Sequence, residues 1–132
     1  MGLVQRSVSS TVRKRLREFL RTFSGEPPTP EETRLRMEFV LRARREVAAG
    51  SGDLLRLLAP AAAADALGDP ERIAAYAETL AAEAAVNEAA GQLERAAALR
   101  RQASTLGRVA QQRMRAPDSD LDRLVGQDGR LD

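Results

Sequence analysis

"NEAAGQLE", residues 87–94, sets the path of the chain through its alanine-rich half. A glycine inside a helix costs only about 1 kcal/mol, so Gly91 could lie within one long helix or turn the chain back. Charge favours the turn, because residues 70–90 are acidic and residues 91–115 are basic, and folding back brings them together. We expect an antiparallel helix pair that turns at about residues 89–92. One long helix is the alternative.

Apolar residues recur at helical spacing on both sides of this stretch. They are Ile73, Ala77, Leu80 and Ala84 before it, and Leu93, Ala96, Leu99, Ala103, Leu106 and Ala110 after it. The first of these helices is expected to begin at Asp69 and Pro70, as N-cap and first helical residue. The second is expected to end near Met114.

Two further segments precede the pair. Thr29 is a candidate N-cap, and Pro30 suits the first position of a helix that runs to about Ala49. The apolar stripe of that helix is expected to comprise Leu35, Phe39, Val40, Ala43 and Val47. Leucines at positions 54, 55, 57 and 58 follow, and Pro60 then breaks or kinks the chain.

These patterns predict an all-α fold, a small helical bundle of four or five helices with an antiparallel Ala-rich helix hairpin. The prolines of "EPPTP", residues 26–30, end the first helix, so we divide the chain into three parts. Residues 1–25 form a basic amphipathic N-terminal helix, which is a candidate targeting or docking segment. Residues 26–115 form the helical domain, and residues 116–132 an acidic tail that we expect to be flexible.

Composition argues against catalysis and cofactor binding. The 132 residues include no histidine and no cysteine, which excludes common zinc sites and histidine- or thiolate-based catalysis. The spacing of Glu78, Glu83, Glu88 and Glu94 predicts a solvated acidic face and no metal site. We therefore expect no catalytic residue, no bound metal and no cofactor, and we do not expect an enzyme.

The N-terminal segment has three interpretations. It is an amphipathic helix rich in arginine, so it could be a core helix, a targeting peptide or a helix on an anionic membrane surface. "RTFS", residues 21–24, resembles the cleavage pattern of mitochondrial presequences, in which an arginine lies three residues before the first residue of the mature protein, here Ser24. With the next helix, this segment supplies the residues that we expect to contact a partner or lipid: Arg13, Lys14, Arg17, Leu20, Arg21, Phe23, Arg34, Arg42 and Arg45.

"RLREFLR", residues 15–21, and "RLRMEFVLRAR", residues 34–44, resemble the start of the LYR-motif proteins, a family of small helical mitochondrial adaptors. The matching residues are Arg17, Leu20, Arg21, Glu38 and Phe39, whereas Arg15 and Leu16 replace the leading leucine and tyrosine of the signature. The resemblance implies an assembly factor or subunit that contacts an acyl carrier protein through the arginines of its first two helices.

The function that we expect is that of a non-catalytic helical adaptor or accessory subunit, which contacts other proteins within a larger assembly. The alternatives are a LYR-like assembly factor of mitochondria and a peripheral membrane protein bound through its basic N-terminal helix. Nucleic-acid binding is not expected, because aromatic stacking residues and a recognition motif are missing. The absence of cysteine suits a reducing compartment, either the cytoplasm or the mitochondrial matrix, and leaves membrane association open.

Overall fold

The computed structural model of the chain describes residues 2–49 and 52–126, and these residues form helices and connections without a strand. The all-α class predicted from the sequence is therefore confirmed. The helices in chain order are α1 (Gly2–Arg21), α2 (Pro30–Ala48), α3 (Gly52–Leu55), α4 (Pro60–Leu67), α5 (Pro70–Ala89), α6 (Leu93–Arg113) and α7 (Ser119–Gly126).

The number of helices differs from the expected four or five. Within the described residues there are four helices of 19 to 21 residues and three short ones. Pro60 is the first residue of α4, so the leucine-rich segment before it forms a separate short helix. The tail contributes another short helix that begins two residues after Pro117.

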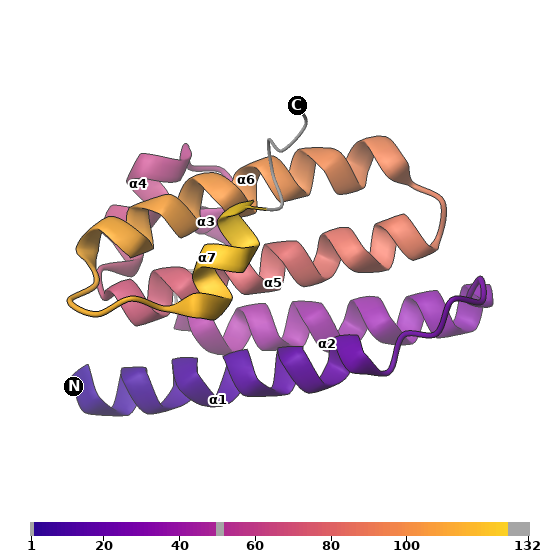
Figure 1. Cartoon of the computed structure of the whole chain (residues 1–132), viewed down its shortest axis with the longest axis horizontal. Coiled ribbons are helices and arrows are strands. Elements are labelled where there is room, and N and C mark those ends of the chain that lie inside the picture. The colour runs from indigo at the N-terminus through magenta and orange to yellow at the C-terminus, as the bar shows by residue number, and fades with distance from the viewer. Residues whose placement is uncertain (1, 50–51, 127–132) are drawn as a thin grey trace.

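Helix α5 lies at the centre of the bundle. It packs against α1 and α2 on one side and against α6 on the other. In Figure 1, α1 and α2 lie side by side below α5, α6 runs back along α5 in the opposite direction, and α7 crosses in front of α5 and α6. Because α5 is covered on several sides, most of its residues between Ile73 and Asn87 are buried.

The turn between α5 and α6 is a Schellman motif centred on Gly91. The backbone N–H of Gln92 donates to the carbonyl of Asn87 at 2.8 Å, and the N–H of Gly91 donates to the carbonyl of Glu88 at 3.0 Å. Gly91 has a φ of 85°, in the left-handed region that glycine adopts without strain. Residues 87–94 therefore do not form one continuous helix.

The predicted caps are confirmed. The hydroxyl of Thr29 accepts a hydrogen bond from the backbone of Glu32, whose carboxylate accepts one from the Thr29 backbone. Asp69 caps α5 by accepting the N–H of Glu71 at 2.8 Å. Each cap satisfies a backbone donor at a helix start, so these two boundaries could be predicted locally.

Helix α1 belongs to the same hydrophobic core as the rest of the bundle. Val12 and Leu16 are each 1% exposed, and Phe19, Leu20 and Phe23 pack partly against the core. Helix α1 ends at Arg21, six residues before Pro27, and the break that follows does not detach it from the fold. The three-part division of the chain therefore does not correspond to three separate packing units.

The tail differs from the flexible segment that we expected. Leu121 and Leu124 are buried against α6, and the hydroxyl of Ser104 lies 3.3 Å from the carbonyl of Val125, to which it donates. The apolar face of α7 provides enough packing to hold residues 119–126 in place. Residues 127–132 lie outside the described residues.

The stripe predicted for α2 is correct for only part of its length. Val40, Ala43 and Val47 are buried, whereas Leu35 and Phe39 are largely exposed. The inward direction of α2 is set by its contact with α5, which turns Leu35 and Phe39 towards solvent and the edge of α1. The ring of Phe39 stacks on Phe19 with centroids 4.5 Å apart.

Gly107 allows α7 to approach α6. A Cβ atom at this position would lie 2.9 Å from Cγ2 of Val125 and 3.0 Å from Cδ2 of Leu124. We predict that Gly107→Leu separates α7 from α6, because the larger side chain occupies the space of these two residues. Limited trypsin digestion should then cleave after Arg115 and Arg123 much faster than in the wild-type protein.

Thr105→Leu is the matched control, since Thr105 is exposed on the same helix. It should leave the digestion pattern unchanged. Equal protection of Arg123 in the Gly107→Leu variant and the wild type would show that α7 does not depend on this close approach.

Candidate functional site

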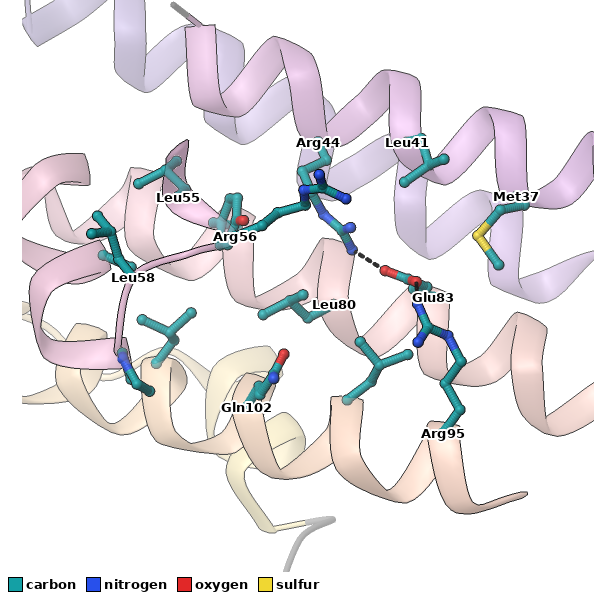
Figure 2. A pocket seen from close by; sticks show the side chains of 15 residues that line it. Met37, Leu41, Arg44, Leu55, Arg56, Leu58, Leu80, Glu83, Arg95 and Gln102 are labelled. Atoms are coloured by element: carbon teal, nitrogen blue, oxygen red, sulfur yellow. Dashed lines mark hydrogen bonds and ion pairs between the residues drawn. The ribbon is translucent and has the colours of Figure 1, made fainter. Parts of the chain in front are cut away.

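A groove of about 430 Å³ lies between α2 and α6, with α5 as its floor. Figure 2 shows α2 along one wall, α6 along the other, and α3 with the start of α4 across one end. This volume is within the range of small-molecule sites, roughly 300 to 1,000 Å³. The groove is lined by Met37, Leu41, Arg44, Leu55, Arg56, Leu58, Pro60, Ala63, Tyr76, Leu80, Glu83, Arg95, Leu99, Gln102 and Leu106.

A chain of charged residues crosses this groove. Nη2 of Arg44 lies 2.7 Å from Oε1 of Glu83, and Nη2 of Arg95 lies 3.2 Å from Oε2 of the same carboxylate. Arg44 also donates from Nε to the hydroxyl of Thr79 and from Nη2 to its carbonyl, both at 3.1 Å. Helices α2, α5 and α6 are thereby linked through one buried carboxylate (Figure 2).

A second charged cluster joins α1, α5 and the connection before α7. Arg13 is buried, and its Nε lies 2.7 Å from Oε2 of Glu78. Nη1 of Arg13 lies 3.1 Å from Glu71 and 3.0 Å from Asp118. Arg17 lies 3.8 Å from Glu78, at the edge of the cluster. A buried guanidinium with three carboxylate partners can remain charged, and it connects three parts of the fold.

The pKa values in this cluster reflect both burial and pairing. Burial raises the pKa of Glu78 above its ordinary value, and the nearby Arg13 and Arg17 charges only partly offset that rise. Burial also opposes ionisation of Asp118, but hydrogen bonds from Arg13 and from the backbone of Leu121 lower its pKa overall. Burial by itself would lower the pKa of Arg13, yet Asp118 and Glu78 raise it.

The acidic face expected from Glu78, Glu83, Glu88 and Glu94 is only partly present. Glu88 and Glu94 are exposed, and Glu88 pairs with Arg100 at 2.9 Å. Glu78 and Glu83 are instead buried, and each binds an arginine from another helix. The prediction of a solvated face was wrong for these two residues because partners from α1 and α2 satisfy them in the interior.

The structure separates the residues that we expected to contact a partner. Arg13 is not accessible at the surface, since its guanidinium is held by internal carboxylates. Arg17 lies 3.4 Å from Asp120 of α7 and is half-exposed. Leu20 and Phe23 are half-buried and line a second hollow of about 340 Å³ between α1, α5 and α7.

The remaining expected residues lie on the solvent side of α1 and α2. Lys14, Arg21, Arg42 and Arg45 are exposed, and none of them forms an ion pair with another described residue. Arg34 is also exposed, but it pairs with Glu38 at 2.5 Å and with Glu31. The hydrogen bond that Arg34 donates to Glu31 and the negative charge of Glu38 raise the pKa of Arg34.

To contact a membrane through its apolar stripe, α1 would have to expose residues that are packed inside the bundle. Val12 and Leu16 belong to the buried core. In the part of the chain that the structure describes, every helix is too short or too polar to cross a membrane.

Three important residues were not identified from the sequence. Arg44 and Tyr76 lie in the groove, and Arg72 donates to the carbonyls of Val47 and Ala48 at 2.7 Å. Arg72 thus satisfies carbonyls that the end of α2 leaves open. One signal for Arg44 was available, because it follows Val40 by four residues and therefore borders the stripe of Val40, Ala43 and Val47.

The chemistry available in the groove is ion pairing, hydrogen bonding and apolar contact. Among residues 2–49 and 52–126, no three acidic side chains are grouped so that they could hold a metal ion. The chain matches no protein-family model, no curated protein and no solved structure. The site is therefore interpreted from its own geometry.

We predict that Arg13→Met destabilises the fold by about 3 kcal/mol, because it leaves a buried carboxylate without its partner while keeping an aliphatic side chain. Arg15→Met is the control, since the Arg15–Glu46 pair is exposed, and it should cost less than about 1 kcal/mol. Urea unfolding at neutral pH measures both. Equal effects of the two substitutions would argue against a structural role for the Arg13 cluster.

A second prediction concerns pH. The lowered pKa of Asp118 stabilises the fold above the pKa of the unfolded chain, and this contribution is lost as pH falls through the folded-state pKa. Wild-type protein should be more stable than Asp118→Asn at pH 7, and the difference should shrink below the ordinary aspartate pKa of about 3.9. Urea unfolding over this pH range tests it.

Asp65→Asn is the matched control, because Asp65 forms an exposed pair with Arg113. Its effect should be small at every pH. A stability difference for Asp118→Asn that stays constant from pH 7 to acid would contradict the assigned role of this carboxylate.

Proposed function

We propose that this protein is a non-catalytic helical adaptor or accessory subunit, which acts through protein–protein contacts within a larger assembly. Its scaffold is a helical bundle organised around the antiparallel, Ala-rich pair of α5 and α6. The partner that we propose is a protein with an acidic surface. It binds the outer face, which we define as the solvent side of α1 and α2 with Lys14, Arg21, Leu35, Phe39, Arg42 and Arg45.

The observation that carries this proposal is the set of four exposed cations on that face. Lys14, Arg21, Arg42 and Arg45 have no ion-pair partner among the described residues. The neighbouring pairs Arg15–Glu46 and Arg34–Glu38 show that other cations on the same two helices are matched. An unmatched group of cations attracts an acidic partner and guides its approach.

Apolar side chains accompany these cations. Leu35 is 50% exposed and Phe39 is 37% exposed. Phe39 is held by its stacking on Phe19, and Arg36 lies over the ring of Phe23 at 3.9 Å. An ordered aromatic side chain loses little freedom when a partner covers it, and aromatic residues are enriched at protein interfaces.

A LYR-like assembly factor is a second candidate. Arg21 and Phe39 are two of the residues that carry the resemblance, and both lie on the outer face. A peripheral membrane protein is a third candidate, because an anionic lipid surface is attracted by the same four cations. The experiment below separates a protein partner from a membrane.

The experiment places a photo-crosslinking phenylalanine analogue at Phe39 in the full chain, expressed in the cells from which the sequence comes. A single crosslinked protein is expected. Charge reversal with Lys14→Glu, Arg42→Glu and Arg45→Glu should reduce that adduct at least tenfold. The physical reason is that reversal replaces attraction by like-charge repulsion.

Two controls test the specificity of this result. Arg101→Glu, Arg108→Glu and Arg115→Glu reverse three exposed arginines outside the outer face and should leave the adduct unchanged. The analogue at Leu93, which is 64% exposed at the start of α6, should give no such adduct. Equal adducts from Leu93 and Phe39, or binding to anionic vesicles without a protein adduct, would count against the adaptor.

A further inference from the structure

The groove between α2 and α6 contains a buried guanidinium with one unused donor group. Arg44 is only 7% exposed, and it lines the groove. Its Nε and Nη2 groups bind Thr79 and Glu83, whereas Nη1 has no partner within the described part of the chain. In that part, every side-chain nitrogen or oxygen that is cut off from solvent has a hydrogen-bond partner. Because Nη1 of Arg44 has none, it must be accessible from the groove.

Tyr76 supplies a second unused donor beside it. Tyr76 is 3% exposed, and its ring lies 5.8 Å from the guanidinium carbon of Arg44. Its hydroxyl makes no hydrogen bond to any residue that the structure describes. Burial raises the pKa of Tyr76 more than the charges of Arg44 and Arg56 lower it, so the hydroxyl keeps its proton at neutral pH and can donate.

The charges of the groove lining are not balanced. Three arginines line the groove against one glutamate, and that glutamate already binds Arg44 and Arg95. Arg56 is exposed and forms no ion pair with a described residue. The groove therefore carries an excess of positive charge near Tyr76.

Apart from Gln102, the rest of the lining is apolar, and the groove is closed at one end. Leu80 of α5 contributes to the floor and Leu99 of α6 to one wall. Leu55 and Leu58 lie at the end near α3 (Figure 2), and Pro60 begins α4. A groove closed at one end suits a short ligand better than a continuous partner helix. Its volume of about 430 Å³ accommodates an alkyl chain together with a small head group.

We propose that this groove binds a small amphipathic monoanion, which is a single apolar chain with one carboxylate. The carboxylate accepts from Nη1 of Arg44 and from the Tyr76 hydroxyl, and Arg56 adds a positive charge at the rim. Both residues line the groove, and two separate donors can each bind one oxygen of a carboxylate. The apolar chain lies along Leu80 and Leu99. This site is on the opposite side of α2 from the outer face, so it does not rest on the adaptor function.

The test uses three probes with the same ten-carbon chain, at concentrations below the micelle concentration of the two ionic probes and below the solubility limit of the neutral one. These are decanoate, decanol and decyltrimethylammonium, which carry a negative, neutral and positive head group. Calorimetric titration of the full chain should show decanoate binding about tenfold more tightly than decanol, which is the effect of a charge-assisted hydrogen bond. The cationic probe should bind most weakly.

Two variants test the head-group contacts without removing a structural partner. Tyr76→Phe removes only a hydroxyl that has no protein partner, and Arg56→Gln removes an exposed charge. Each should weaken decanoate binding by about three- to tenfold and leave decanol binding unchanged. Arg108→Gln, on an exposed position of α6 that does not line the groove, is the matched control and should change neither probe.

The location of binding can be tested directly because the chain has no cysteine. Gln102→Cys introduces a single thiol on the groove wall, and an environment-sensitive fluorophore there should respond to decanoate. Equal affinity for decanoate and decanol would overturn the proposal, and so would unchanged binding in both variants. Binding only to anionic vesicles, or a dimer in light scattering whose groove cysteine is protected from labelling, would also overturn it.

Discussion

The two buried glutamates of α5 are the constraint on which the rest of the structure depends. A carboxylate in a helical interior is stable as a charged group only when a cation and further hydrogen bonds surround it. Glu78 obtains this from Arg13 of α1, and Glu83 from Arg44 of α2. The rest of the core is built mainly from alanine and a few larger apolar residues. These residues pack closely, but they do not by themselves specify which helix faces meet. The ion pairs therefore define where α1 and α2 lie on α5.

The same pairs organise the two surfaces of α2. Arg44 points towards α5 and the groove, whereas Arg42 and Phe39 point towards solvent. A single helix thus separates an enclosed polar and apolar groove from a basic outer surface. Because the two surfaces share no residue, a protein partner and a small ligand could be bound at the same time.

Alternating charge blocks along the sequence become contacts between neighbouring helices. The acidic block of α5 and the basic block of α6 meet in the Glu83–Arg95 and Glu88–Arg100 pairs. Asp118 in the acidic tail returns to Arg13 at the other side of α5, so it ties the start of α7 to α1. The net charge of +2 therefore conceals extensive internal pairing. Against this background, the cations on the solvent side of α1 and α2 that have no ion-pair partner among the described residues indicate where a partner would bind.

Local chemistry determined the helix class, the caps at Thr29 and Asp69, and the proline and glycine boundaries, because each depends on residues close in the sequence. Tertiary structure alone decided the burial of Arg13, Arg44, Glu78 and Glu83, the docking of α7, and the exposure of Leu35. A single helix pattern cannot reveal these outcomes, since a charged residue is buried only if another helix brings its partner. The groove follows from the same rule, because its walls come from segments more than 50 residues apart, as Leu41 and Leu99 illustrate.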